Sequence, residues 1–254
     1  MKLSLAVAGK GGTGKTTLAA MMVRTLVQTG VRPVLAVDAD PNSNLAEALG
    51  VELGRPLAEI REQASSPEGS PSSGVGRVRA VEDEIQRSIT EADGFDLVTM
   101  GRPEGPRCYC YVNTLLRKSL DGLSGSYAAV ILDNEAGMEH LSRRTTNDVD
   151  FLVAVMDPTL PAFRAVKRIV GLSDELPIKI GRKLVLLNRQ GPDGLPEAVG
   201  SQLAQLGVEQ LPPVPQDDEV WQAGAAGRDV FSLPDDTPAL AAVRKVYEQL
   251  KTRT

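Results

Sequence analysis

The stretch GKGGTGKTT occupies residues 9–17 and follows directly on the apolar run LSLAVA at residues 3–8. The run predicts a buried strand, and the residues from about Thr16 to Gly30 predict a helix, so the glycine-rich stretch is the turn between them. Glycines permit positive φ and let several backbone N–H groups face one anion, while the helix N-terminus adds partial positive charge at the same place. Strand, G-x-x-x-x-G-K-T spacing and helix together predict a loop that binds the phosphates of a nucleoside triphosphate.

Two side chains of this loop have predicted roles in nucleotide chemistry. Lys15 can reach the β- and γ-phosphates, and the Thr16 hydroxyl can hold Mg²⁺. The loop residues that we expect to contact the nucleotide are Gly11, Gly12, Thr13, Gly14, Lys15, Thr16 and Thr17.

Length and composition limit the class of protein. A chain of 254 residues with 42% hydrophobic and 24% charged residues fits a single α/β domain over residues 1–254. The net charge of −5 argues against nucleic-acid binding through a general basic field. The sequence contains no run of eighteen apolar residues and starts without a signal-peptide pattern, so we expect no membrane association and a cytoplasmic location.

Apolar runs alternate with helical stretches along the chain, which predicts a mostly parallel, doubly wound sheet with helices on both faces. The expected strands cover residues 3–8, 34–38, 95–100, 128–133, 151–156 and 183–188, with a weaker candidate at 208–211. The expected helices begin near Thr16, Asn44, Cys110, Met138, Pro161, Leu195, Val220 and Pro238. Residues 64–76 are rich in Ser, Pro and Gly and predict a surface loop, and residues 78–89 predict a short helix.

Acidic residues follow two of the expected strands. The second strand runs into DADPNSN at residues 38–44, and the fourth ends at Asp133 after the apolar residues AVIL. The carboxyl ends of strands in a doubly wound sheet meet at the nucleotide, so Asp38, Asp40 and Asp133 are candidate Mg²⁺ or catalytic groups. In an extended segment Asp38 and Asp40 would face the same side. The alternative is that Asp40 and Asn42 cap the next helix, and for Asn42 and Ser43 capping is what we expect.

The two cysteines of the chain, Cys108 and Cys110, form a C-x-C pair in the sequence GRPEGPRCYCY at residues 101–111. Two thiolates cannot complete a four-coordinate metal shell, but a symmetric dimer would supply four. Thiolates suit Zn²⁺, Ni²⁺, Cu⁺ or an iron–sulfur cluster, and packing or redox roles remain as alternatives. The single histidine, His140, is expected to be a packing or surface residue.

The loop carries a second lysine, Lys10, and in this KGGTGKT form it resembles the deviant phosphate loop of nitrogenase iron protein, septum-site, partition and arsenite-pump ATPases. The segments VEDEI (residues 81–85), GRPEGPRCYCYVN (101–113) and DNEAGMEHLSRRT (133–145) further resemble the CooC-type accessory ATPases of carbon monoxide dehydrogenase maturation. The resemblance implies a homodimer, promoted by nucleotide and metal, that sandwiches two ATP molecules.

That resemblance also implies roles for single residues. Lys10 would reach the partner's phosphates, Asp40 would orient or deprotonate the attacking water, and Asp38 and Asp133 would support Mg²⁺. Glu135 and Gly137 would lie in a second switch segment. Asn188 and Arg189 would recognise adenine, with Pro213 in the loop LPPVPQD (residues 211–217) on the other side of the base.

The implied activity is ATP hydrolysis coupled to delivery of Ni²⁺, or Zn²⁺ in its place, through Cys108 and Cys110, with carbon monoxide dehydrogenase as the client. The alternatives are an electron-transfer ATPase carrying an iron–sulfur cluster at the same cysteines and a spatial-organisation ATPase of the partition or septum type.

Overall fold

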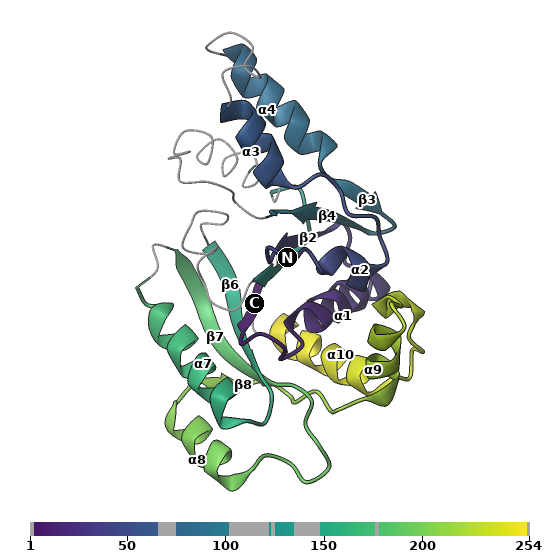
Figure 1. Ribbon diagram of the computed structural model, residues 1–254. Coiled ribbons are helices and arrows are strands. Elements are labelled where there is room, and N and C mark those ends of the chain that lie inside the picture. Colours follow the sequence, from purple (N-terminus) through teal and green to yellow (C-terminus); the bar gives the residue numbers. More distant parts are fainter. Residues whose placement is uncertain are drawn as a thin grey trace.

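An eight-stranded sheet in the order β3-β4-β2-β5-β1-β6-β7-β8 forms the centre of the molecule (Figure 1). The computed structural model describes residues 3–65, 75–101, 122, 125–134, 148–175 and 178–252. Neighbouring strands run parallel, except that β3 and β4 are antiparallel. The strands are β1 (Leu3–Gly9), β2 (Val34–Ala39), β3 (Thr90–Ala92), β4 (Phe95–Thr99), β5 (Ala129–Asn134), β6 (Asp148–Met156), β7 (Lys179–Leu187) and β8 (Glu209–Gln210).

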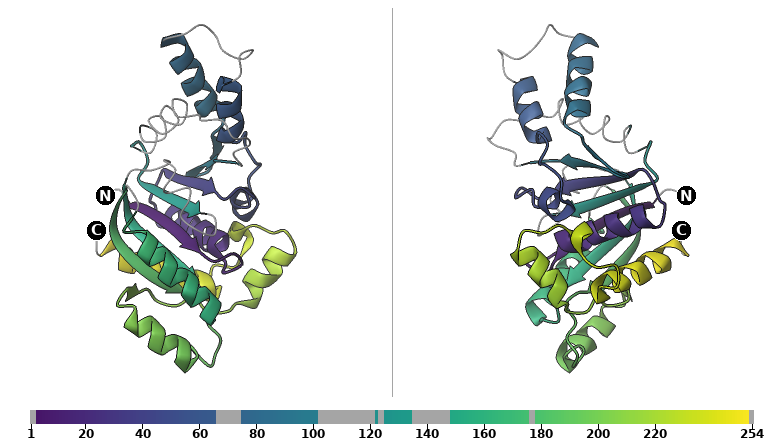
Figure 2. Two further views of the ribbon diagram at one scale, coloured as in Figure 1. Left: turned by 60° about the vertical axis from the view of Figure 1, so that its left-hand side comes forward. Right: turned by 90° about the vertical axis from the view of Figure 1, so that its right-hand side faces the viewer.

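Helices cover both faces of this sheet, as Figures 1 and 2 show. One apolar cluster joins the sheet to α1, α2, α9, η1 and α10, and a second cluster joins the opposite face to α3, α4, α7 and α8. The helices are α1 (Lys15–Gln28), α2 (Leu45–Leu49), α3 (Leu57–Ser65), α4 (Val75–Arg87), α7 (Leu160–Leu172), α8 (Glu197–Gln205), α9 (Asp218–Ala225), α10 (Pro238–Lys251) and the 3₁₀ helix η1 (Val230–Ser232). The predicted α/β fold with a doubly wound, mostly parallel sheet is confirmed.

The order of the strands creates a candidate ligand site at the carboxyl ends of the central strands. Strand β1 lies between β5 and β6, so the chain crosses from one side of β1 to the other at this point. Such a switch in strand order leaves a crevice at the carboxyl ends of the strands. The register puts Asp38 of β2 beside Asp133 of β5, and Asp133 beside Val7 of β1. The two aspartates therefore lie next to the start of the phosphate loop.

Several elements differ from the expected ones. Strand β3 was not predicted, because it has three residues, although Asp93-Gly94 is a hairpin turn signal and Gly94 has a φ of 88°. Helix α3 was also not predicted, and it runs through Ser65, while α4 begins at Val75. The predicted loop at 64–76 is therefore wrong at both ends. The helices expected near Cys110 and Met138 lie outside the described residues.

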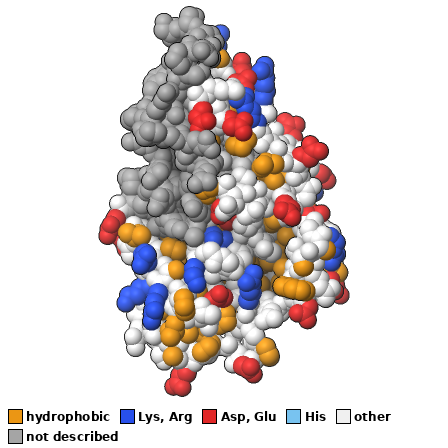
Figure 3. Space-filling model, viewed as in Figure 1, with side chains coloured by type: hydrophobic (Ala, Val, Ile, Leu, Met, Phe, Trp, Pro, Cys, Tyr) orange, Lys and Arg blue, Asp and Glu red, His pale blue; other side chains and the backbone are white. Residues whose placement is uncertain are grey.

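The net charge of −5 does not exclude a local cluster of basic side chains. Lys and Arg side chains gather at the lower left of Figure 3, and Arg164, Lys167 and Arg168 of α7 are exposed. Net charge alone does not predict such a local basic surface.

Within the described residues, no helix is long and apolar enough to cross a membrane.

Candidate active site

The phosphate loop is held in shape from outside by the residues that follow β7. The Asn188 side-chain amide donates to the Thr13 carbonyl at 2.8 Å, and the Arg189 guanidinium donates to the Gly12 carbonyl at 2.9 Å. Gly12 and Gly14 have φ values of 83° and 85°, which only glycine adopts without strain. A Cβ atom at Gly14 would lie 2.5 Å from the Asn188 nitrogen. The loop thus depends on glycine both for its backbone conformation and for this close approach.

The two lysines of the loop lie in different surroundings. The Lys15 ammonium is buried, with the residue 7% exposed, and donates to the Lys10 carbonyl at 3.3 Å. The Thr13 hydroxyl donates to the same carbonyl at 2.8 Å. The Lys10 residue is exposed at the rim of the loop. The Lys15 side chain therefore lies inside the phosphate loop, where we expect it to contact phosphate, whereas Lys10 is exposed to solvent.

Asp38 and Asp133 bring two buried carboxylates to the adjacent ends of β2 and β5, where the residues are 0% and 1% exposed. The Asp38 oxygens accept hydrogen bonds from the Asp40 N–H at 3.1 Å and the Leu45 N–H at 2.8 Å. Neither oxygen of Asp133 has a hydrogen-bond partner among the described residues. A buried charge without partners is costly, so this arrangement indicates a missing cationic or polar ligand.

Burial raises the pKa of both carboxyls. The pKa of Asp133 rises to about 7, chiefly through desolvation, and the neighbouring Asp38 charge raises it further. The Thr16 hydroxyl and the Lys15 ammonium pull that pKa down, but their effect is smaller than that of burial. Desolvation raises the pKa of Asp38 to about 6, against the lowering effect of the Leu45 and Asp40 N–H groups.

This donor set fits Mg²⁺. Carboxylate and hydroxyl oxygens are the ligands that Mg²⁺ prefers, and Asp133 presents two unpaired oxygens near Thr16. The described residues contain no group of three or more His, Cys, Asp and Glu side chains that could hold a metal by themselves. A Mg²⁺ ion at this edge would thus complete its shell with nucleotide phosphates and water, as is usual for this ion.

Asp40 lies just past the end of β2, where the chain bends. Its carboxylate accepts from the backbone N–H and the side-chain amide of Asn42, both at 2.9 Å. The expected capping of α2 by Asn42 or Ser43 is wrong. The N-cap position is Asn44, which makes no side-chain cap, and Asp38 accepts the Leu45 N–H instead.

A pocket of about 600 Å³ begins at the phosphate loop and extends away from it. Gly14 and Thr17 line its inner end, Asn188 and Arg189 one side, and the remaining residues are Met21, Val214, Pro215, Gln216, Asp217, Val220, Trp221, Gly224, Ala225 and Ala239. The side formed by residues 214–217 is fixed to β7's end by hydrogen bonds from Gln190 N–H to Val214 O (3.0 Å) and Gln216 N–H to Gln190 O (2.9 Å). Pro213, predicted to face the base, is exposed and does not line this pocket, whereas Pro215 does.

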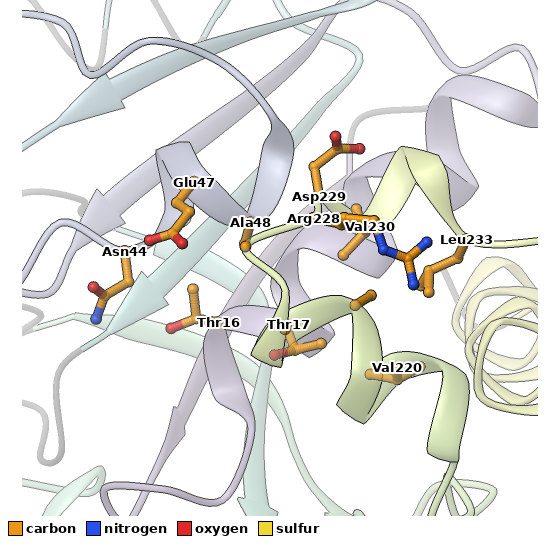
Figure 4. Close-up of a pocket in the computed structure, with 13 residues that line it drawn as sticks. Thr16, Thr17, Asn44, Glu47, Ala48, Val220, Arg228, Asp229, Val230 and Leu233 are labelled. Carbon is orange, nitrogen blue, oxygen red and sulfur yellow. The ribbon is translucent and has the colours of Figure 1, made fainter.

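A second, smaller pocket of about 260 Å³ lies on the other side of α9 (Figure 4). It is bounded by α1, α2, α9 and the segment that leads into η1, with Thr16, Asn44 and Glu47 on one side and Arg228 and Asp229 on the other. Both pockets are lined by Thr17, Val220 and Gly224. Helix α9 is thus the common wall between the two pockets.

The remaining predicted residues cannot be placed. Cys108, Cys110, Glu135, Gly137 and His140 lie outside the described residues. The predicted metal site at the C-x-C pair and the second switch segment therefore stay predictions.

Two buried polar side chains that the sequence did not point to connect elements of the fold. Asn134, next to Asp133 and 1% exposed, donates to the Val7 carbonyl at 3.0 Å and so connects β5 to β1. Arg24 of α1, which is 3% exposed, donates to the Leu233 carbonyl at 2.9 Å and pairs with Asp235 at 2.7 Å. An arginine in the otherwise apolar stretch of α1 is a signal that could have indicated such an anchor.

The phosphate loop, the paired aspartates at the switch in strand order and the adjoining pocket define a phosphate-loop ATPase. The CobQ/CobB/MinD/ParA nucleotide-binding domain matches residues 5–230, and the chain belongs to this family of ATPases.

Several individual proteins are similar to the chain. It is 34% identical to an uncharacterized ATP-binding protein of Methanocaldococcus jannaschii over 248 residues, which cover 97% of each protein. It is 35% identical to the carbon monoxide dehydrogenase accessory protein CooC of Rhodospirillum rubrum over 189 residues, covering 70% of this chain and 71% of that protein.

Solved structures share the fold. The cell division ATPase MinD of Pyrococcus furiosus gives a TM-score of 0.72 at 20% identity, with 100% of both chains covered. The septum site-determining protein MinD of Pyrococcus horikoshii, complexed with Mg-ADP, gives a TM-score of 0.71 at 19% identity, covering 100% of this chain and 97% of that one.

Proposed function

We propose that the chain is a nucleotide-dependent homodimeric metallochaperone ATPase, which binds Ni²⁺ or Zn²⁺ between its subunits and assists metal-cluster maturation of carbon monoxide dehydrogenase. The observation that carries this proposal is the similarity to the accessory protein CooC over 189 residues, in a chain whose cysteines form a single C-x-C pair. The ATPase site described above supports the nucleotide-dependent part.

The described residues have separate roles in ATP hydrolysis. The buried Lys15 ammonium and the loop N–H groups hold the phosphates, and the hydrogen bonds from Asn188 and Arg189 keep those groups in position before the ligand arrives. Bound Mg²⁺ would be held by Thr16, Asp133 and Asp38 and would neutralise phosphate charge. Asp40, which is only half-buried and follows β2, orients or deprotonates the attacking water. Lys10 reaches the phosphates in the partner subunit.

Asn188 also favours adenine over guanine. One N–H of its side-chain amide donates to the Thr13 carbonyl, and we infer that this bond orients the amide so that its oxygen acceptor faces a ligand in the adjoining pocket. An acceptor matches the exocyclic amine of adenine and repels the carbonyl oxygen that guanine presents at the same position. We therefore expect ATP to bind more tightly than GTP.

The metal is the cargo in this proposal. Each chain has only two cysteines, so a shell of four thiolates needs two chains. Formation of the dimer then assembles the metal site, and by linkage nucleotide and metal tighten each other's binding.

A metal titration of the whole chain under reducing, anaerobic conditions tests this proposal, with Ni²⁺ and Zn²⁺ as probes and with and without a non-hydrolysable ATP analogue. We expect one ion per dimer, tighter binding with the analogue, and loss of tight binding in Cys108→Ala and Cys110→Ala. Tyr109→Phe, between the two cysteines, is the matched control. One ion per monomer, or full affinity in either cysteine variant, contradicts the proposal. Visible absorbance of an iron–sulfur cluster would favour the electron-transfer alternative instead.

A further inference from the structure

Trp221 is the only tryptophan of the chain, and it is 72% exposed. A single exposed apolar side chain is by itself ordinary, but an exposed indole that lines a pocket offers a large flat face to a ligand. Trp221 lies in the first turn of α9 and lines the pocket of about 600 Å³ that begins at Gly14 and Thr17 of the phosphate loop. The exposed indole therefore borders a pocket that adjoins the phosphate loop.

The position of Trp221 is fixed by the start of its helix. The Asp217 carboxylate accepts the N–H groups of Glu219 at 3.0 Å and Val220 at 3.4 Å, which caps α9. The other oxygen of Asp217 accepts the Ala239 N–H at 2.9 Å and so fixes α9 to the start of α10. The backbone that carries Trp221 is held before any ligand binds, which lowers the entropic cost of a contact made there.

Several of the polar side chains that line this pocket already form hydrogen bonds within the protein. The Asn188 nitrogen and the Arg189 guanidinium are bound to carbonyls of the phosphate loop. Aliphatic side chains such as Val214 and Pro215 line the pocket, and among the described residues Trp221 is the one aromatic residue that lines it. A flat purine ring would gain most from an aromatic face in such a pocket, because stacking needs no hydrogen-bond partner.

We propose that the indole of Trp221 stacks on the purine ring of the bound nucleotide and supplies most of the base's contribution to affinity. This inference rests on the proposed nucleotide site. It assigns the ranking of nucleotides to two residues: Trp221 provides affinity for any purine, and Asn188 provides the preference for adenine.

Binding measurements with ATP and with inorganic tripolyphosphate separate the base from the phosphates. Stacking contributes about 1–3 kcal/mol per base, so Trp221→Ala should weaken ATP binding by roughly 5- to 150-fold. Tripolyphosphate should bind Trp221→Ala as it binds the wild type, because it has no base. Trp221→Phe should keep most of the ATP affinity. Leu172→Ala, which truncates another exposed apolar side chain (42% exposed) on α7, is the matched control.

The single tryptophan also gives a direct signal. Its fluorescence should change with ATP and ADP and should not change with tripolyphosphate. Equal losses for ATP and tripolyphosphate in Trp221→Ala, or no loss for either, would overturn the proposal. Failure of the wild type to bind ATP at all would instead overturn the nucleotide site itself.

Discussion

Replacing Asp133 by Asn should stabilise the nucleotide-free protein at neutral pH while it damages the active site. Burial raises the pKa of Asp133 to about 7 from an ordinary value of 3.8, a difference of about three units. At about 1.4 kcal/mol per unit, ionising this carboxyl in the folded state costs about 4 kcal/mol. The unpaired amide of the variant carries its own desolvation cost of about 1–3 kcal/mol. The net gain in the free energy of unfolding at pH 8 is then about 1–3 kcal/mol.

The sign of the pH dependence follows from the raised pKa. Between pH 4 and pH 7 the unfolded chain has lost the Asp133 proton and the folded chain keeps it, so the stability of the wild type falls as pH rises. Asp38, with its pKa raised to about 6, adds to the fall over a narrower range. The loss is complete above pH 7. The Asp133→Asn variant lacks the contribution of Asp133, which is the larger of the two. Its free energy of unfolding should therefore change less with pH than that of the wild type.

Urea unfolding without nucleotide and Mg²⁺, at pH values from 5 to 8, measures this effect. Asp93→Asn, which alters a carboxylate whose side chain is 94% exposed, is the control and should follow the wild type. Mg²⁺-dependent ATP hydrolysis should be strongly reduced in Asp133→Asn. The reasoning is refuted if this variant is less stable than the wild type at pH 8, or if its stability changes with pH as steeply as that of the wild type.

Three further substitutions test the loop and its neighbours. Gly14→Ala should weaken nucleotide binding and lower stability by at least about 1 kcal/mol, because φ is 85° and the new Cβ would lie 2.5 Å from Asn188; unchanged binding in calorimetry would contradict this. Lys10→Ala should bind ATP as a monomer but lose ATP-dependent dimerisation and hydrolysis, and sedimentation with a non-hydrolysable analogue that still shows a dimer would exclude the role in the partner. Asp40→Asn should still bind ATP but should hydrolyse it about 10²–10⁴-fold more slowly. If the rate of phosphate release is unchanged, Asp40 has no role in hydrolysis and only forms its hydrogen bonds with Asn42.

The sequence predicts those parts of the site that depend on periodicity and chain order. Asp38 and Asp133 follow apolar runs, and parallel strands bring such positions to one edge, so their proximity could be predicted before their register was known. The phosphate loop could be predicted because its spacing, its strand and its helix occur together.

Details that depend on where the chain turns could not be predicted. Ser43 has a φ of 53°, and the carboxylate of Asp38 accepts the N–H of Leu45, beyond this turn, as well as that of Asp40. Pro215 and not Pro213 lines the pocket beside the phosphate loop, because Gln190 pairs with Pro215 beyond the two-residue strand β8, and the resemblance that suggested Pro213 does not show this pairing. Trp221 gave no signal in the sequence, because its importance comes from exposure beside a pocket.

The most direct test of the account is ATP hydrolysis by the wild type and by Lys15→Ala in the presence of Mg²⁺. The buried Lys15 ammonium lies within the phosphate loop, so its removal should lower turnover by at least about 10²-fold and strongly weaken nucleotide binding. Lys245→Ala, which removes an exposed lysine from α10, is the control and should keep wild-type turnover. Loss of phosphate release in Lys15→Ala alone is the predicted result. Turnover by Lys15→Ala at the wild-type rate, or no hydrolysis by the wild type, would contradict the account.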